Sequence, residues 1–580
     1  MSLEPWQTAL IALAVVFVGL FVIIQLARLY AKRIYHKWLH TPVATPLDVD
    51  SFVNSSVNPP KYLKIAVLQR LSVGDRKATN EVIELSSYDS THLPGLQITQ
   101  RAQPRPGSNK TFETKCSPIK ISSDLPAPLV IGTIRMGFGH HRIAYATCSW
   151  AIHADKDHAA LSSTTAKTPA ARTTYFHDLL NIDSPEADLI HSTDAFYSKM
   201  SRITSNLGGP FEKLWGKATL SGDADALRIS GLTAIHLRPL FKDLPKDTPI
   251  LATHCYVALA AVAAGMTNVI NLVIDNHPQW FVVVPGCLNL VQGPVNYQSF
   301  LRMGVSPENL QLAGHWIPRD VCVSIPEDCA KRIARAKVGF ADPVADHTGR
   351  GSPSTSTKSE APKPRRFLIP VGGAGAQRNF IVQLLRALAP YVHSGSVQLF
   401  LNAGDHKHMH QAFEDTLFEL GFRIDESYLV VRTLDGVRDF QKKLLEGQEP
   451  PSPITLFAFN EYFPAVATTD VISRVTDVLA CKPSELAFYP VPKLMIRRVG
   501  DHEQYSALRA AELGDGTLEA REIDDAMTFV KCVINRPELL VSMNECIMKN
   551  ATAGIYDGCK NAVKLVLQRA ETQRREGHLV

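Results

Sequence analysis

The stretch LVIGTIRMGFGHHRIAYA, residues Leu129–Ala146, joins a short apolar run to a glycine-containing turn and a helix-like segment. The run Leu129–Ile131 predicts a buried strand, and Gly132–Arg142 predicts a tight turn that leads into a helix at Ile143–Ala146. The N-terminus of such a helix has unpaired N–H groups and the positive end of the helix dipole, which favour an anionic group. The turn fits a purely structural connection equally well, because Gly-x-Gly alone is not specific.

The same alternation of short strands and helical stretches continues along the chain and predicts an α/β protein with two Rossmann-like lobes. The first lobe is expected at residues 62–340 and the second at residues 366–516. Between them, residues 341–365 are rich in Ser, Pro and Lys, which predicts a flexible linker. Residues 517–580 contain no strand candidate and predict C-terminal helices, the last of which crosses back onto the first lobe.

The composition excludes several classes of protein. With 580 residues, 45% hydrophobic and 20% charged, the chain is neither disordered nor collagenous and is long enough for two lobes. The net charge of +5 is spread along the chain, so no nucleic-acid partner is expected. The ten Cys residues form no Cys-x-x-Cys pair, which favours a reducing compartment. His406–His410 has closely spaced imidazoles but no Cys beside it, and no metal site is predicted there.

The N-terminus contains an uncharged apolar stretch between Glu4 and Arg28. Its length predicts a transmembrane helix at residues 5–27, followed by a juxtamembrane tether at residues 28–61. Because the basic residues follow this stretch, the N-terminus is expected outside or in a lumen and the body in the cytosol. A cleaved signal peptide is the alternative, but the apolar stretch has no basic residues before it and no small-residue cleavage site behind it.

Polar side chains follow two more predicted strands of the first lobe. Thr253-His254 follows the run Pro249–Ala252, and Asp275-Asn-His277 follows Val269–Ile274. Because open α/β sheets bind ligands at the carboxyl ends of their strands, these side chains are expected to converge with His140 or His141. Either of those two histidines can accept a proton near neutral pH. Each histidine, considered singly, fits a structural loop position as well.

The second lobe repeats the strand, glycine turn and helix pattern at Arg366–Leu388, where Gly372–Gly375 is suited to donor phosphates. Further on, Glu485 can accept both hydroxyls of a ribose, and Glu503 and Gln504 can bind sugar hydroxyls. Nearby cations are candidates to bind a diphosphate; they are Lys482, Arg497 and Arg498. A helix-capping role for Glu485 and solvated side chains for the arginines are the alternatives.

Together these segments resemble the two-lobed GT-B glycosyltransferases of the MurG and monogalactosyldiacylglycerol synthase type. The resemblance covers roughly residues 128–516. The stretches that carry it are Gly137–His140, Thr253-His254, Asp275–His277, Gly314–Pro318, Gly372–Gly375, Glu485–Ile496 and His502–Tyr505. Two positions depart from the family pattern, since Lys482–Ser484 stands where the family has a glycine-rich loop and Pro490 replaces a glycine.

The resemblance implies a membrane-anchored hexosyltransferase that moves a sugar with inversion from a UDP-sugar to a lipid acceptor, without a cofactor or metal. It implies that His140 is the base and that Asp275 and His277 orient it or contact the acceptor. The acceptor-side residues are Gly137, Gly139 and His254, and the donor-side residues are Gly372, Gly373, Gly375, Lys482, Glu485, Glu503 and Gln504. The alternatives are an inactive membrane-tethered scaffold with this fold, which the altered donor loop favours, and an enzyme similar to a nucleotide-sugar 2-epimerase.

Overall fold

The structure is a computed structural model. It describes residues 4–45, 47–54, 82–106, 113, 115–119, 128–135, 138–154, 172–188, 190–191, 199, 203, 225–340, 361–372 and 377–577. Three of the predicted site residues, Gly137, Gly373 and Gly375, lie outside these ranges. Most of the predicted linker, residues 341–360, also lies outside them.

The first lobe contains a nine-stranded sheet in the order β3-β1-β2-β5-β4-β6-β7-β8-β9. All neighbours from β2 to β9 are parallel, whereas β1 pairs with β2 and β3 in antiparallel fashion. Its strands are β1 (Leu85–Asp89), β2 (Leu96–Arg101), β3 (Ser117–Pro118), β4 (Leu129–Thr133), β5 (Thr174–Asp178), β6 (Ile250–Ala252), β7 (Val269–Leu272), β8 (Leu288–Val291) and β9 (Leu310–Leu312).

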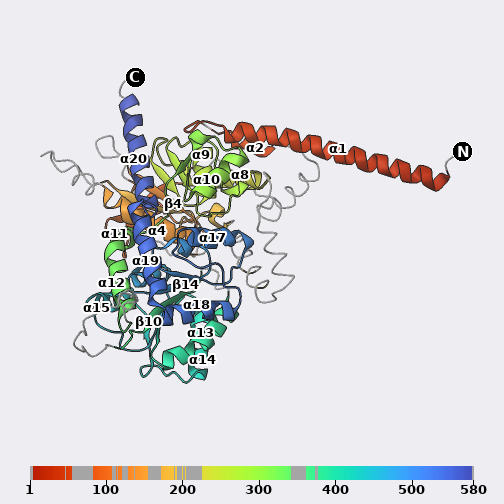
Figure 1. The fold of residues 1–580 in the computed structure, drawn as a ribbon. Coiled ribbons are helices and arrows are strands. Elements are labelled where there is room, and N and C mark those ends of the chain that lie inside the picture. Colours follow the sequence, from red (N-terminus) through yellow and green to blue (C-terminus); the bar gives the residue numbers. More distant parts are fainter. Residues whose placement is uncertain are drawn as a thin grey trace.

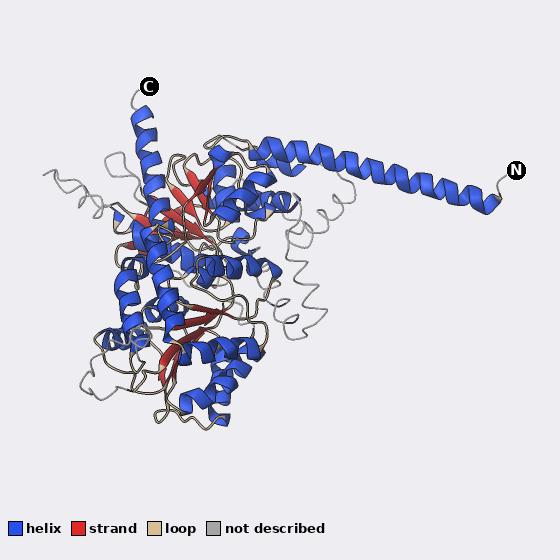
Figure 2. Ribbon diagram, viewed as in Figure 1, coloured by secondary structure: helices blue, strands red, loops and turns tan. Residues whose placement is uncertain are grey.

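The second lobe contains a six-stranded sheet, parallel throughout, in the order β12-β13-β11-β10-β14-β15. Its strands are β10 (Arg365–Pro370), β11 (Val397–Gly404), β12 (Tyr428–Val431), β13 (Ile454–Ala458), β14 (Val478–Cys481) and β15 (Lys493–Met495). Strands β4 and β10 are buried at every position, as in parallel sheets that helices cover on both faces (Figure 2). The prediction of an α/β protein with two parallel sheets is therefore confirmed.

Helices connect and cover the two sheets. In the first lobe they are α4 (Gly139–Ala151), α8 (Asp225–Leu237), α9 (Cys255–Ala263) and α10 (Pro294–Met303), and α11 (Arg319–Val323) and α12 (Ile325–Lys337) lead to the second lobe. The second lobe has α13 (Arg378–His393), α14 (Lys407–Glu419), α15 (Leu434–Leu445), α16 (Tyr462–Ser473) and α17 (Gln504–Glu512). The C-terminal helices are α18 (Ile523–Asn535), α19 (Pro537–Thr552) and α20 (Gly558–Gly577).

Helix α4 begins at Gly139, four residues before the predicted start at Ile143. The strand before it, β4, begins at Leu129 as the apolar run predicts. Because the helix begins earlier, His140, His141 and Arg142 lie in its first turn, and their side chains point in three different directions along the helix surface.

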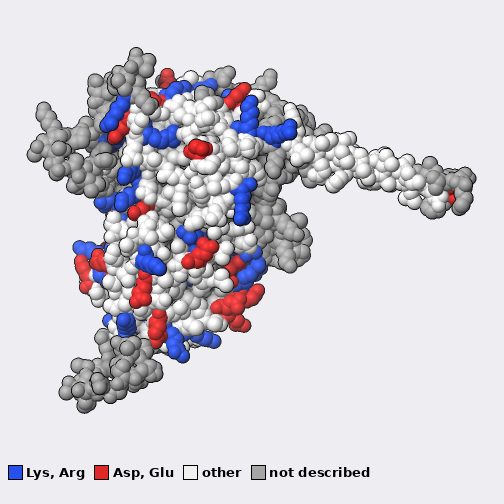
Figure 3. Space-filling view, turned by 45° about the horizontal axis from the view of Figure 1, so that its top comes forward, with Lys and Arg blue, Asp and Glu red and all other residues white. Residues whose placement is uncertain are grey.

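The N-terminus forms one long helix, α1 (Pro5–Leu39), which projects from the first lobe (Figure 1). Within the part of the chain that the structure describes, no helix is long and apolar enough to cross a membrane, so the predicted transmembrane helix at residues 5–27 is not supported. The projecting part of α1 shows almost no charge in Figure 3, and apolar side chains from Leu10 to Leu29 are exposed on the helix.

Residues 28–61 were predicted to form a tether. In the structure, the end of α1 and the residues after it dock on the first lobe instead. Leu39, Leu47 and Val49 are buried in its apolar clusters. Asn309 donates hydrogen bonds to the carbonyl oxygens of Leu39 and Thr41, at 3.3 and 2.6 Å. The short helix α2 (Val49–Asn54) follows and packs against α8. The end of α1 is thus fixed to the lobe by apolar burial and by hydrogen bonds.

The chain crosses from one lobe to the other at two segments that lie side by side. Residues 314–318 leave the first lobe, and residues 554–558 return toward it before α20, whose apolar side packs on α4, β6 and β7. The two passages are hydrogen-bonded, since the His315 N–H donates to the Ile555 carbonyl (2.6 Å) and the Gly558 N–H donates to the His315 carbonyl (3.0 Å). The backbones are so close that a Cβ added at Gly558 would lie 2.5 Å from the carbonyl oxygens of Gly314 and His315.

Substitution of Gly558 by Ala is expected to destabilise this crossing, because the added methyl group meets backbone atoms that cannot rotate away. The expected loss is about 1–3 kcal/mol of unfolding free energy, measured as a lower thermal midpoint. Gly19→Ala is the matched control, since nothing lies within 4 Å of an added Cβ in that helix. Equal midpoints for Gly558→Ala and Gly19→Ala would show that the two passages are not tightly packed.

Candidate functional site

His140 lies in the first turn of α4, at the carboxyl edge of the first sheet. Its Nδ1 is 2.9 Å from the carbonyl oxygen of Thr253, which follows β6. The Thr253 hydroxyl in turn donates to the His140 carbonyl oxygen at 3.2 Å. A carbonyl can only accept, so Nδ1 carries the proton in this contact and Nε2 is the unprotonated nitrogen of the neutral ring.

The surroundings of His140 keep its ring neutral. Burial lowers the pKa of His140, and the contact with Thr253 and the carboxylates of Asp275 and Glu485 offset that effect only in part. A neutral imidazole with a fixed Nδ1–H can accept a proton at Nε2, as a general base must. The orienting contact comes from the Thr253 backbone rather than from Asp275 or His277.

The other histidines of this edge have structural partners. His254 is the N-cap of α9, where its Nδ1 accepts the Tyr256 N–H at 3.1 Å. His141 is buried on the opposite side of α4, with Nε2 3.0 Å from the Asp178 carboxylate. Of the two histidines that the sequence proposed in this turn, His140 is therefore the candidate base and His141 belongs to an internal contact with Asp178.

Glu485 of the second lobe faces the first turn of α4. A Cβ added at Gly139 would lie 3.1 Å from Glu485 Oε2, and Arg142 Nε lies 3.7 Å from Oε1. Glu485 begins a short 3-10 turn, Glu485–Phe488, after β14. The structure thus brings Glu485 close to His140 and to the N-terminal end of α4, across the boundary between the lobes.

Arg142 is the centre of a buried polar cluster between the lobes. Its guanidinium donates to Asp470 Oδ1 at 2.6 Å and to the Val466 carbonyl at 3.0 Å. Tyr489 donates its hydroxyl to the same Asp470 oxygen at 2.6 Å. Burial lowers the pKa of Arg142, but the adjacent Asp470 carboxylate outweighs this effect and raises it. This cluster, Arg142–Asp470–Tyr489, is a contact that the sequence did not reveal, because Arg142 lies more than 300 residues before the other two members.

The predicted donor residues of the second lobe are partly engaged with one another. Lys482 forms an ion pair with Glu503, and Glu503 also accepts the N–H of Val499 at 2.8 Å. The Lys482 side chain lies against the turn after β10, since a Cβ added at Gly372 would be 2.9 Å from Lys482 Cε. Lys482 is therefore held beside the predicted phosphate turn, whereas Glu503 is buried and Gln504 is exposed at the start of α17.

Asp275 and His277 follow β7 on the same edge as His140. The His277 ring lies 4.6 Å from the Tyr505 ring of α17, which belongs to the second lobe. Burial and the nearby His502 lower the pKa of His277, so its ring is also neutral. Asp275 acts on His140 through its charge, without a direct hydrogen bond. The structure therefore places Asp275 and His277 at the same sheet edge as His140.

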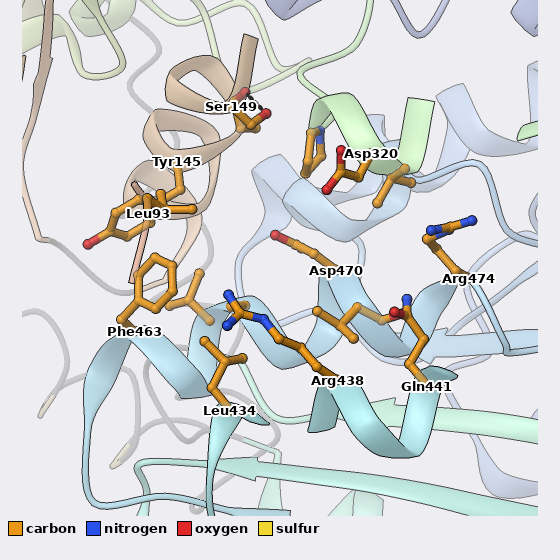
Figure 4. Close-up of a pocket in the computed structure, with 16 residues that line it drawn as sticks. Leu93, Tyr145, Ser149, Asp320, Leu434, Arg438, Gln441, Phe463, Asp470 and Arg474 are labelled. Carbon is orange, nitrogen blue, oxygen red and sulfur yellow. Dashed lines mark hydrogen bonds between the residues drawn. The ribbon is translucent and has the colours of Figure 1, made fainter. Parts of the chain in front are cut away.

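A separate cavity of about 220 Å³ lies further along α4 (Figure 4). Tyr145 and Ser149 form one wall, and Arg438, Gln441 and Arg474 form the opposite one, with Asp470 between them. The predicted site residues do not line this cavity. Its arginines are already paired, because Arg474 contacts Asp328 at 3.1 Å and Arg438 contacts Asp435 at 3.4 Å.

Two protein-family models match the chain. Both are described as domains of unknown function, DUF6937 over residues 108–302 and DUF6938 over residues 348–567. Neither covers half of the chain, so neither assigns the whole protein to a family. No curated protein matches it in sequence.

Solved structures are similar only at a low level. A UDP-GlcNAc 2-epimerase from Neisseria meningitidis bound to UDP-GlcNAc has 12% identity and a TM-score of 0.39, with 77% of this chain and 100% of that chain covered. HepE from Anabaena in complex with UDP and glucose has 10% identity and a TM-score of 0.35, with coverages of 77% and 99%. An E. coli structure described as trehalose-6-phosphate bound with UDP-2-fluoro glucose has 12% identity and a TM-score of 0.35, with coverages of 76% and 99%. Because these scores are low, the assignment of the site rests on its own geometry.

Substitution of Arg142 by Met is expected to lower the unfolding free energy by about 3–5 kcal/mol, because it leaves the buried Asp470 without its cation. The measurement is the thermal midpoint of the full chain. Arg438→Met is the matched control, since the Arg438 side chain is 50% exposed and its ion pair is expected to contribute less than about 1 kcal/mol. A midpoint for Arg142→Met no lower than that of Arg438→Met would contradict the importance of the cluster.

Proposed function

We propose that the protein transfers a sugar from a UDP-sugar on the second lobe to an acceptor hydroxyl on the first lobe, with inversion at the anomeric carbon. The observation that carries the proposal is the position of His140. Its Nδ1–H is fixed on the Thr253 carbonyl, and its basic Nε2 belongs to the same turn that meets Glu485 of the opposite lobe. Such a transfer needs a base for the acceptor hydroxyl close to a group that binds the donor nucleoside. In the proposal, His140 of the first lobe is the base and Glu485 of the second lobe binds the nucleoside.

In this reaction the acceptor hydroxyl gives its proton to His140 Nε2 as its oxygen attacks the anomeric carbon. The bond between that carbon and the diphosphate oxygen breaks, and UDP leaves with the electron pair. Lys482 and the N-terminus of α13 supply positive charge at the second lobe, where the negative charge of the diphosphate increases. The ion pair with Glu503 fixes the direction of the Lys482 side chain toward this turn.

The proposal includes a lipid acceptor and association with a membrane surface. What supports this part is the apolar surface of α1, whose exposed side chains include Phe17, Val18 and Phe21. The end of α1 is fixed to the first lobe, which is the proposed acceptor lobe. A lipid surface that binds α1 would therefore lie at a constant position relative to that lobe. Burial of exposed apolar side chains in lipid is favourable in proportion to their area.

A second candidate is a non-catalytic scaffold with the same two lobes. The observation that favours it is that both carboxylates expected to bind the donor already have partners, Glu485 near Arg142 and Glu503 with Lys482. In a scaffold these pairs would be permanent, whereas in an enzyme the Glu485 carboxylate must turn from Arg142 toward the ribose.

The variant His140→Ala is expected to lose turnover by about 10²–10⁴-fold, because proton removal from the acceptor then has no positioned base. UDP affinity, measured by calorimetry, should stay within about twofold, since His140 lies on the acceptor lobe. His393→Ala, at an exposed histidine of α13, is the control and should keep both properties.

Three results would contradict the transfer reaction. If neither UDP nor any UDP-sugar binds the full chain, the scaffold candidate is favoured. If the UDP-sugar is converted to its 2-epimer without an acceptor, the protein is an epimerase. If His140→Ala turns over as fast as the wild type, another group is the base.

Removal of residues 1–30 is expected to abolish co-flotation of the protein with phosphatidylcholine and phosphatidylglycerol vesicles, because it removes the exposed apolar part of α1. The buried residues from Leu39 onward stay in place, so UDP affinity should not change. The triple variant Phe17→Asp, Val18→Asp and Phe21→Asp keeps the helix length and is expected to show the same loss. Equal flotation of all three proteins would contradict the lipid proposal.

A further inference from the structure

Three buried side-chain amides at the carboxyl ends of β7 and β8 have oxygens without a hydrogen-bond partner. They are Asn276, Gln292 and Asn296, whose exposed fractions are 6%, 1% and 2%. A buried carbonyl oxygen that loses its contact with water and gains none in the protein costs free energy. Since most buried polar groups in folded proteins are paired, three such oxygens at one edge require an explanation.

The direction of two of these amides, Gln292 and Asn296, is fixed by their nitrogen atoms. Gln292 donates its Nε2 to the carbonyl of Ile274, and Asn296 donates its Nδ2 to the carbonyl of Asn276 at 3.0 Å. Because carbonyls accept and do not donate, exchanging the amide oxygen and nitrogen would break these bonds. The amides of Gln292 and Asn296 are therefore anchored to the loop 274–276, and their oxygens remain free to accept.

Two buried nitrogen atoms without a hydrogen-bond partner lie near these amides, although the Arg509 guanidinium also contacts Glu512 at 3.5 Å through another nitrogen. Arg509 of α17 lies against the backbone before α10, since a Cβ added at Gly293 would be 3.0 Å from Arg509 Nε, and that nitrogen has no hydrogen-bond partner. His277 Nδ1 is also buried and without one. The His277 ring contacts Tyr505, one turn before Arg509 on α17. Helix α17 of the second lobe thus contacts the loop 274–277 through Tyr505 and lies against Gly293 through Arg509, next to the segments that hold the free amides.

The mixture of free acceptors and donors indicates the chemistry of a ligand. The dianion of a phosphate monoester could accept from Arg509 but has no hydrogen to give to the amide oxygens. A metal cation could satisfy the oxygens but would be repelled by Arg509. Hydroxyl groups both donate and accept, so a group with several hydroxyls satisfies both sets.

We propose that Asn276, Gln292, Asn296 and Arg509 bind a sugar or other polyol group of the acceptor. The inference rests on the proposed function and deepens it, because it defines the acceptor as a molecule that already has a polyhydroxyl head. The site adjoins the base, since Asp275 precedes Asn276 and acts on His140 through its charge. An acceptor held there would present one of its hydroxyls toward Nε2 of His140.

The test uses the full chain and measures binding of methyl β-glucoside, methyl β-galactoside, myo-inositol and methyl phosphate by calorimetry, with and without UDP. At least one polyol is expected to bind, and Asn276→Leu should weaken it by about tenfold, the effect of one lost hydrogen bond to a polar ligand. Asn276→Asp is the matched control, because it keeps an oxygen at the same place and should retain binding within about threefold. UDP affinity should be the same in all three proteins.

The inference would be overturned by binding of methyl phosphate without any polyol, or by polyol binding that Asn276→Leu leaves unchanged. Absence of polyol binding in a protein that binds UDP would also overturn it, while leaving the transfer reaction in place. Polyol binding that responds to Asn276→Leu in a protein that binds no UDP would support the polyol site and contradict the transfer reaction. The two proposals can therefore fail separately.

Discussion

The contact of Arg142 with Asp470 determines how the two lobes sit against each other. Arg142 comes from α4 of the first lobe and is 3% exposed, and its partner comes from α16 of the second. A buried guanidinium that loses its carboxylate is strongly destabilised, so the interface tolerates little sliding of one lobe along the other. Because His140 precedes Arg142 by two residues in the same helix, this ion pair also fixes the distance between the candidate base and the second lobe.

The contact between the lobes also places Glu485 beside Arg142, which conflicts with its assigned role in binding a ribose. The carboxylate that lies near Arg142 Nε is the one that the resemblance assigns to a ribose. Asp470 already neutralises Arg142 at 2.6 Å, whereas Glu485 is 3.7 Å away and is a weaker partner. Glu485 is therefore the partner that Arg142 can release at the smaller cost, and Glu485 could turn to the ribose of a nucleoside without breaking the contact between the lobes.

The parts of the fold that depend on local sequence were predictable. The apolar run at Leu129–Ile131 gave the strand, and the polar residues after Ala252 and Ile274 gave the edge at which His140, Asp275 and His277 gather. Contacts between distant segments were not predictable, because nothing near Arg142 in the sequence indicates Asp470. The docking of Leu39 and Val49 was missed for the same reason, since their partners come from later parts of the first lobe.

The amides of Asn276, Gln292 and Asn296 show a further limit of sequence reasoning. Asparagine and glutamine are common in turns and at helix starts, so their presence after β7 and β8 is unremarkable as sequence. Their significance comes from burial, since an amide oxygen in a turn normally meets water. Helix α17, which comes from a distant part of the chain, lies beside these segments, since Tyr505 contacts His277 and Arg509 lies against Gly293. The first lobe therefore provides the amide oxygens, and α17 of the second lobe adds Arg509 beside them, which gives the proposed site its preference for hydroxyl groups.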